Sequence, residues 1–178
     1  MASIEYVREQ GRHGLFNAPP FNNDHPARDT NVDREVVVLV YPPIPGLTRS
    51  PRDLHWSLSW RVDAGVCRHL HIVTEDTPYD PQLRRRYVYW GPVTKSVDEA
   101  TRGAQQVSLG YMSPLLRRRI EALALTVGVA KPNGNWNSQN WILDLLCKLC
   151  EARIIDQGKW SEVVARAPHV WDQWFQRR

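Results

Sequence analysis

The sequence predicts an α+β fold in which an antiparallel sheet is followed by C-terminal helices. Between residues 35 and 109, apolar residues form short runs or alternate with polar residues, which is typical of β-strands. From residue 113 onward they recur every three or four positions, which is typical of amphipathic helices. Because the strands come first and the helices after them, we expect one α+β domain with an antiparallel sheet. A chain of 178 residues is of ordinary size for such a domain.

Residues 1–34 differ in composition from the rest of the chain. They are polar and are interrupted by Pro19, Pro20 and Pro26, so we expect an irregular N-terminal arm before a single domain at residues 35–178. The first residues carry no apolar run of the kind found in signal peptides. No stretch approaches the ~18 apolar residues of a membrane-spanning helix. We therefore expect a cytoplasmic protein without a membrane span.

The first two predicted strands are Val36–Tyr41 and His55–Val62. Val36–Tyr41 is a continuous apolar run, as in a buried strand, and the prolines that follow end it. In His55–Val62 apolar and polar residues alternate, so the strand has one face of each kind. The apolar face carries Trp56, Leu58, Trp60 and Val62, and the polar face carries His55, Ser57, Ser59 and Arg61.

A hairpin is predicted next, because a turn at 63–65 leads into a second strand, Val66–Val73. On this returning strand His69 and His71 share one face with Cys67. Two further strands are expected at Arg86–Trp90 and Gln106–Leu109, separated by a polar loop.

The helices follow from capping residues and from apolar spacing. Ser113-Pro114 is a favourable helix start, and Gly128 is expected to end that helix. A second helix is expected to begin near Asn137-Ser138. Ser161 is expected to cap a third, and Pro168 to separate it from a last amphipathic segment with Trp171, Trp174 and Phe175.

The net charge of +4 raises the question of an anionic partner. Local basic runs occur at Arg84–Arg86 and Arg117–Arg119. However, 19 acidic residues are scattered along the chain, and no glycine-aromatic RNA motif, zinc-finger spacing or phosphate-binding glycine loop is present. Nucleic acid is therefore not expected as a partner.

The three cysteines do not form the even set of a small disulfide-rich secreted protein. Cys147 and Cys150 form a C-x-x-C, but there is no second C-x-x-C to complete a metal site. We expect both to lie on the apolar face of a helix, buried and unreactive, beside Leu146 and Leu149.

The most informative residues are His55, which opens a strand, and Ser138, which opens a helix. A side chain on the first turn of a helix lies beside unpaired backbone N–H groups and the positive end of the helix dipole. These groups can activate a nucleophile or stabilise an oxyanion, and a nearby imidazole can act as the general base.

At these positions the chain resembles the circularly permuted papain-like proteins, including the lecithin:retinol acyltransferase family. Those proteins carry a His-Trp strand, a second His on the next strand, and a later Asn-Cys-Glu/Gln helix start. The order here is the same: His55-Trp56, then His69 or His71, then Asn137-Ser138-Gln139, with an aromatic residue at Trp141. Small fungal proteins of unassigned function with His-Trp and Asn-Cys-Gln-x-Trp signatures are also similar. The resemblance covers approximately residues 50–155.

The resemblance implies a role for each of these residues. His55 would be the base, His69 or His71 would orient it, and Ser138 would occupy the nucleophile position. Gln139 and the first-turn N–H groups would stabilise an oxyanion formed from a small-molecule or acyl substrate. The reaction would break an acyl, amide or thioester bond and would need no cofactor and no metal. An apolar wall for the substrate would be formed by Trp56, Trp90, Trp136 and Trp141.

One departure from the family pattern leaves alternatives open. The family nucleophile is Cys, whereas this chain has Ser138. The chain is then a serine enzyme, a relative that has lost catalysis, or the product of a deliberate Cys-to-Ser replacement. Without catalysis, the fold would serve a binding or accessory protein of a biosynthetic pathway. In the simplest interpretation, Ser138 is only the N-cap of its helix.

A metal site is the competing interpretation of the two strand histidines. His69 and His71 with Glu75 have the spacing H-x-H-x-x-x-E, which binds divalent metals in cupin-like barrels. The second histidine motif of such barrels is missing, and the helical C-terminal third does not suit a barrel.

Overall fold

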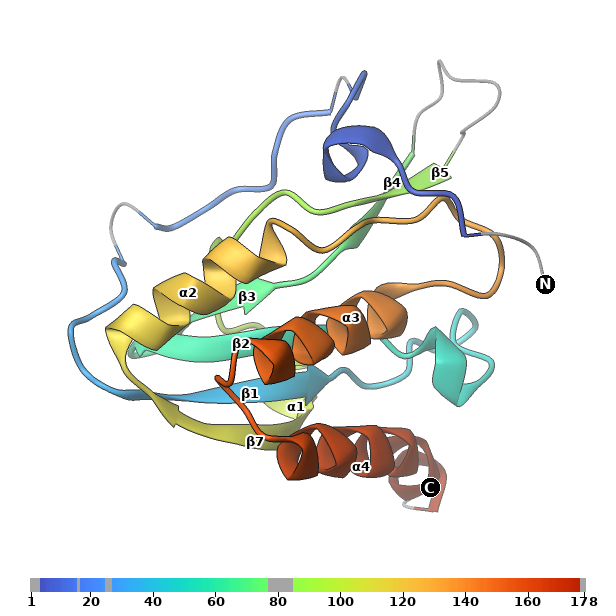
Figure 1. The fold of residues 1–178 in the computed structure, drawn as a ribbon. Helices are drawn as coiled ribbons and strands as arrows, with labels where there is room; N and C mark the ends of the chain where they lie inside the picture. The colour runs from blue at the N-terminus through green and yellow to red at the C-terminus, as the bar shows by residue number, and fades with distance from the viewer. Residues whose placement is uncertain (1–3, 16, 25–26, 77–84, 177–178) are drawn as a thin grey trace.

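The structure, a computed structural model, describes residues 4–15, 17–24, 27–76 and 85–176, with side chains as far as Arg166. It confirms the predicted α+β class: helices pack against an antiparallel sheet of five strands (Figure 1). In spatial order the strands are β6 (Val93–Ser96), β3 (Val66–Leu70), β2 (Trp56–Asp63), β1 (Arg34–Val40) and β7 (Gln105–Met112).

The core lies between this sheet and helices α2 (Pro114–Ala124), α3 (Ser138–Glu151) and α4 (Gln157–Gln176). These three helices lie on one side of the sheet (Figure 1). The alternation predicted for β2 is confirmed, because its apolar face is buried in the main core. The residues of that face are Trp56, Leu58, Trp60 and Val62.

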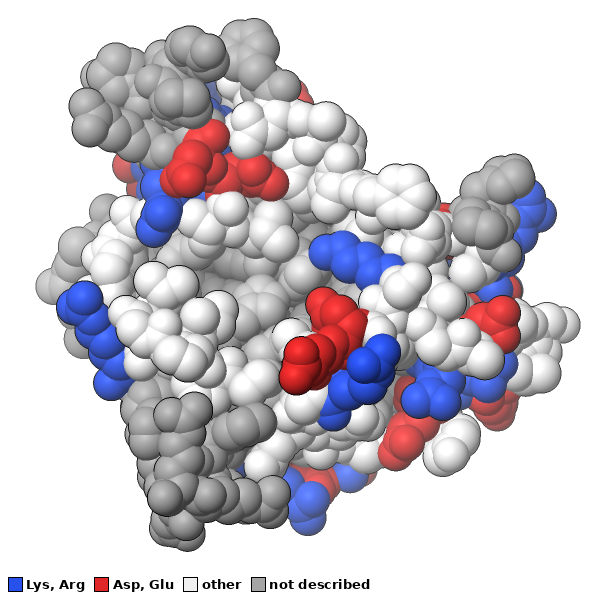
Figure 2. All heavy atoms as spheres, turned by 180° about the vertical axis from the view of Figure 1, so that it is seen from behind, with Lys and Arg blue, Asp and Glu red and all other residues white. Residues whose placement is uncertain are grey.

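The opposite face of the sheet is covered less completely. Val37 and Leu39 of β1 form a small second cluster there with Ala104, which follows the short helix α1 (Glu99–Gly103). Seen from behind, the molecule is hollowed near its centre, and charged side chains lie around the hollow (Figure 2). A cavity of about 510 Å³ on this face is lined by residues that include Ser59, Cys67 and Tyr111.

The predicted hairpin forms between β2 and β3, but the returning strand is shorter than expected. β3 ends at Leu70, and the chain then enters a separate two-stranded sheet made of β4 (Val73–Asp76) and β5 (Arg85–Val88). The predicted single strand Val66–Val73 is therefore wrong, because its last residue pairs with β5 rather than with β2. Strand β6 was not predicted, since its four residues are stabilised by pairing with β3 and by hydrogen bonds between Thr94 and the arm, all of which depend on residues distant in sequence.

Helix α2 begins where the sequence predicts, and Ser113 accepts a hydrogen bond from the backbone N–H of Leu116. It ends at Ala124, four residues before Gly128. The arm completes this end: the Gln10 side-chain amide donates to the carbonyls of Ala124, Leu125 and Val127. Carbonyl groups that the helix itself cannot satisfy are thus paired by a residue from far away in the sequence.

Helix α4 differs from the prediction both in where it begins and in its continuity through Pro168. It begins at Gln157, where Asp156 accepts a hydrogen bond from the N–H of Lys159, so Ser161 lies inside the helix. Pro168 also lies inside this single helix and does not divide it. The side chains of Trp171, Trp174 and Phe175 lie outside the described part. Among the described residues, no helix has both the length and the apolar character needed to cross a membrane.

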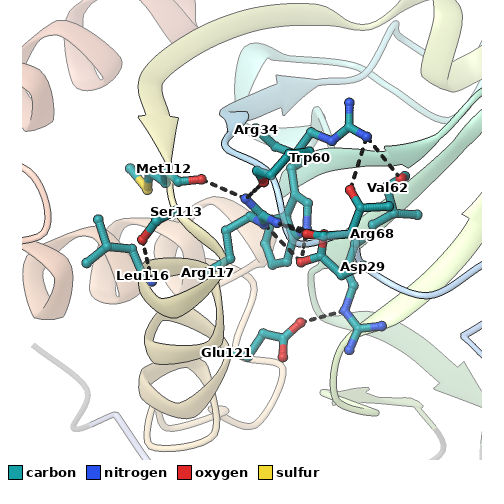
Figure 3. Close-up of polar contacts among 12 residues, drawn as sticks. Asp29, Arg34, Trp60, Val62, Arg68, Met112, Ser113, Leu116, Arg117 and Glu121 are labelled. Carbon is teal, nitrogen blue, oxygen red and sulfur yellow. Dashed lines mark hydrogen bonds and ion pairs between the residues drawn. The ribbon is translucent and has the colours of Figure 1, made fainter.

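The arm is fixed to the domain by Arg117, whose side chain is fully buried (Figure 3). Its guanidinium binds the carboxylate of Asp29 through two nitrogens, at 2.8 and 2.9 Å. The remaining donors bind the carbonyls of Thr30, Val32 and Met112. Five hydrogen bonds satisfy the five N–H groups of this guanidinium, so the burial of its charge is compensated.

Arg117 and Arg86 are both buried, which breaks up the two basic runs. Arg68, outside the two runs, is also paired: it binds Glu121 of α2 and Asp24 of the arm. Arg84 lies outside the described residues. Neither run therefore forms a continuous basic surface in the part of the chain that the structure describes.

Candidate active site

A cavity of about 270 Å³ lies where β2 begins, and it contains both His55 and Ser138. Its walls come from the 3₁₀ turn η2 (Pro51–Asp53), from β4 and from the loop before α3. Trp136 and Tyr87 form an aromatic part of the wall, with ring centroids 5.5 Å apart. The structure thus brings together the two residues that the sequence singled out, although His55 and Ser138 are 83 positions apart in the sequence.

Ser138 is the first residue of α3 and is only 8% exposed. The N-cap is Asn137, whose Oδ1 accepts a hydrogen bond from the N–H of Gln139 at 3.0 Å. The Ser138 hydroxyl instead accepts a hydrogen bond from the backbone N–H of Trp56, at 3.4 Å. The interpretation of Ser138 as the N-cap is therefore wrong, because the neighbouring asparagine caps the helix.

The first turn of α3 is tied to the turn that precedes His55. Asn137 donates through Nδ2 to the carbonyl of Arg52, and Arg52 donates to Oδ1 of Asn140. Asn140 in turn accepts a hydrogen bond from the N–H of Asn137, which completes a capping box. These bonds fix the start of β2 against the start of α3, so His55 and Ser138 occupy set positions.

Gln139 belongs to the same connection. Its side-chain amide donates to the carbonyls of Pro51 and Leu54, at 2.7 and 3.0 Å. Both donors of this amide are engaged, so Gln139 holds the turn in place rather than facing an oxyanion. The backbone N–H of Ser138 has no hydrogen-bond partner among the described residues, which makes it the donor available at this helix start.

His55 is paired with His71 rather than with His69. Nε2 of His55 lies 2.8 Å from Nδ1 of His71, and the two rings meet at an interplanar angle of 63°. His69 lies farther along the same face, with its ring centroid 6.1 Å from that of His71. The sequence left the choice between these two histidines open, and the geometry gives His71 as the partner.

All three histidines are held in the neutral form at pH 7. Burial lowers the pKa of His55 to about 4, and the proximity of His69 and Lys95 adds to this shift. Burial also lowers the pKa of His69 to about 4 and that of His71 well below its usual value of 6.5. A neutral imidazole can accept a proton, which a general base requires.

The Ser138 hydroxyl and His55 share the cavity without being bonded to each other. In the part of the chain that the structure describes, this hydroxyl has the N–H of Trp56 as its partner and no imidazole. Likewise, Nδ1 of His55 has no hydrogen bond to a described residue. Hydrogen bonds between catalytic groups are often long or poorly aligned before substrate binds.

Of the four tryptophans predicted to form the substrate wall, Trp136 lines the cavity. Trp56 and Trp141 pack in the main core instead, because the strand alternation and the helical spacing both point them toward the helix-covered side of the sheet. Trp90 donates through its indole N–H to Glu75, at 3.0 Å. Tyr87 and Arg52 line the cavity and were not predicted, since neither belongs to a motif visible in the sequence.

The predicted alternative, a metal site, finds no cluster to support it. The carboxylate of Glu75 accepts hydrogen bonds from Asn17 and Trp90. Among the described residues, no group of three or more His, Cys, Asp or Glu side chains is placed to hold a metal ion.

Comparisons of the chain with protein-family models, with curated proteins and with solved structures found no significant match. Inference about function therefore starts from the geometry of the cavity and from the short motifs around His55 and Ser138.

Proposed function

We propose that the chain is a papain-like enzyme of the permuted type that hydrolyses or transfers an acyl group, acting on an ester, amide or thioester bond. Ser138 is the nucleophile, His55 the general base, and His71 the residue that orients His55. One observation carries this proposal: His55, paired with His71, lies in the same cavity as a serine on the first turn of a helix.

The reaction follows from these positions. Oγ of Ser138 attacks the carbonyl carbon of the substrate, and its proton passes to Nδ1 of His55. The negative charge on the carbonyl oxygen lies near the backbone N–H of Ser138 and the positive end of the α3 dipole. When the tetrahedral intermediate collapses, the leaving group takes the proton from His55. Water or an acceptor alcohol, thiol or amine then removes the acyl group from Ser138 by the reverse steps.

His71 determines which nitrogen of His55 acts as the base. The mechanism requires the tautomer of neutral His55 with its proton on Nε2, which then donates to Nδ1 of His71 across the 2.8 Å between them. Nδ1 of His55 is then unprotonated and can accept the serine proton. The low pKa of His55 makes its protonated form a strong acid, which favours release of the leaving group.

Covalent trapping tests this proposal directly. The protein is incubated with p-nitrophenyl acetate or a fluorophosphonate, and the adduct is located by intact-mass and peptide mass spectrometry. We expect one adduct on Ser138, its loss in Ser138→Ala, and a strong decrease in His55→Ala. Ser161→Ala, which changes an exposed serine, serves as the matched control. An adduct that survives Ser138→Ala, or no adduct at all, contradicts the proposal.

A second candidate is a non-catalytic protein that binds a small molecule in the same cavity, as an accessory protein of a biosynthetic pathway. The hydrogen bond from Trp56 N–H to the Ser138 hydroxyl favours it, because that contact directs the hydroxyl toward the backbone instead of His55. The variant Ser138→Cys separates the two candidates. If the introduced thiol also fails to form an adduct with p-nitrophenyl acetate, the binding function is favoured over catalysis.

A further inference from the structure

Tyr41, Ser57 and His69 form a largely buried polar group beside the candidate active site. They lie on the face of the sheet opposite the main core, where Val37 and Leu39 are also found. Ser57 is fully buried, and His69 is only 3% exposed. Neither Tyr41 nor His69 lines the cavity that contains His55 and Ser138, so neither is placed to touch a substrate there.

Tyr41 contacts His55 through both backbone and side chain. Its N–H donates to the carbonyl of His55 at 3.0 Å, which extends the pairing of β1 with β2 by one residue. Its ring lies against the His55 imidazole, with centroids 5.2 Å apart and an interplanar angle of 45°. Rotation of the His55 ring is therefore restricted on the side that faces Tyr41.

The hydroxyl of Tyr41 is held in turn by two polar side chains. It lies 3.3 Å from Oγ of Ser57 and 3.4 Å from Nδ1 of His69. Burial raises the pKa of Tyr41, so the hydroxyl stays protonated and remains a donor at neutral pH. Leaving such a hydroxyl buried without partners is costly, which means that these contacts fix the position of the ring.

His69 closes the set of contacts. Its ring lies beside His71, and His71 is hydrogen-bonded to His55. Each member of the sequence Tyr41, His55, His71, His69 therefore contacts the next, and His69 contacts Tyr41 again. Four side chains from three segments of the chain thus form a closed group around the imidazole that faces the cavity.

We propose that Tyr41 and His69 are positioning residues that hold His55 in the single orientation with Nε2 toward His71 and Nδ1 toward the cavity. This use of the orientation rests on the proposed function, but the orientation itself can be measured without catalysis. Phenylalanine at position 41 would fill the same space beside His55. The hydroxyl of Tyr41, held by His69, is therefore the group that fixes the orientation of the two rings.

The test measures the tautomer of His55 by nitrogen-15 NMR of histidine-labelled protein at pH 7. In the parent protein we expect a single tautomer with the proton on Nε2. In Tyr41→Phe and, independently, in His69→Gln we expect a mixture of tautomers or exchange broadening at His55. Tyr111→Phe is the matched control, because Tyr111 is 75% exposed, and it should leave the spectrum unchanged. An unchanged single tautomer in both Tyr41→Phe and His69→Gln overturns the proposal.

A second measurement tests whether Tyr41 affects the reactivity of a thiol introduced at position 138. In a Ser138→Cys background, Tyr41→Phe should slow alkylation of the introduced thiol at pH 7 by roughly two- to tenfold, the factor that one hydrogen bond corresponds to. Tyr111→Phe should not change that rate. If the thiol is unreactive in every variant, the proposed function fails, whereas the NMR result still decides whether Tyr41 and His69 orient His55.

Discussion

Nε2 of His55 lies 2.8 Å from Nδ1 of His71, within one hydrogen bond. His55 precedes β2, and His71 follows β3, so the antiparallel pairing of the two strands brings them to the same end of the sheet. Two imidazoles at this distance can share only one proton between the facing nitrogens. One of the two facing nitrogens therefore donates and the other accepts. In the proposed tautomer Nε2 of His55 is the donor, which leaves Nδ1 of His55 for chemistry.

The buried histidines predict a stability that falls in mild acid. Burial lowers the pKa of His69 to about 4, while the unfolded chain keeps a value near 6.5. Between these values the unfolded state binds the proton and the folded state does not, so stability falls as pH decreases from 6.5 to 4. The expected loss from His69 is about 2 kcal/mol between pH 7 and pH 5.

Burial is the main cause of the low pKa of His69. Of the neighbouring charges, Lys95 lowers this pKa further and Asp98 raises it. Urea denaturation at several pH values checks the prediction. His69→Gln should show a weaker pH dependence than the parent protein, whereas His13→Gln, at an exposed position, should match the parent. Equal pH dependence in all three proteins would show that His69 is not held neutral by burial.

Arg117→Met should destabilise the protein by about 3–5 kcal/mol, because Asp29 loses both of its bonds to the guanidinium and three carbonyls lose the donor that Arg117 gives them. Arg119→Met, two positions away on an exposed part of α2, should change stability by less than about 0.5 kcal/mol. Chemical denaturation measures both values. A similar small effect for the two variants would contradict the anchoring role of Arg117.

The cap of α3 can be tested at Asn137. Asn137→Ala should lower the free energy of unfolding by about 1–2 kcal/mol, since it removes the cap of the helix. Asn137→Asp keeps an oxygen acceptor and should retain most of that stability. Asn31→Ala, at an exposed asparagine, is the control and should have little effect. If Asn137→Ala is as stable as the control, another residue caps the helix.

Cys147 should react rapidly with a thiol reagent in the native protein. The prediction of a buried Cys147 is wrong, because the buried stripe of α3 passes through Leu145, Leu146 and Leu149 and leaves Cys147 exposed. Cys150 is half-buried, and burial raises the pKa of both Cys150 and Cys67. Cys147→Ser should remove the fast phase of labelling. A fast phase that persists in this variant would show that another cysteine is the accessible one.

Local patterns predicted the elements whose stability depends on neighbours in sequence. The alternation in β2 gave its buried face, and Ser113-Pro114 gave the start of α2. Strand β6 and the end of β3 at Leu70 could not be predicted from local patterns, because each depends on pairing between strands distant in sequence.

In the candidate site, too, the residues with a local sequence signal were predicted and the contacts that depend on strand pairing were not. His55 and Ser138 were found from their local settings, a strand start and a helix start. The choice of His71 over His69 depends on where β3 ends, and the contact of Tyr41 with His55 depends on the pairing of β1 with β2. Neither fact is present in the local sequence, so both required the structure.

The most direct test of the active-site account is the pH dependence of alkylation at Ser138→Cys. The measurement uses a background that also carries Cys67→Ser, Cys147→Ser and Cys150→Ser, so that a single thiol reacts. The helix start stabilises the thiolate, and the thiolate in turn favours protonation of His55 beside it.

We expect the introduced thiol to titrate clearly below the free value of about 8.5 and to move toward that value when His55→Ala is added. A thiol that titrates near 8.5 and does not respond to His55→Ala would contradict a catalytic pair at this site.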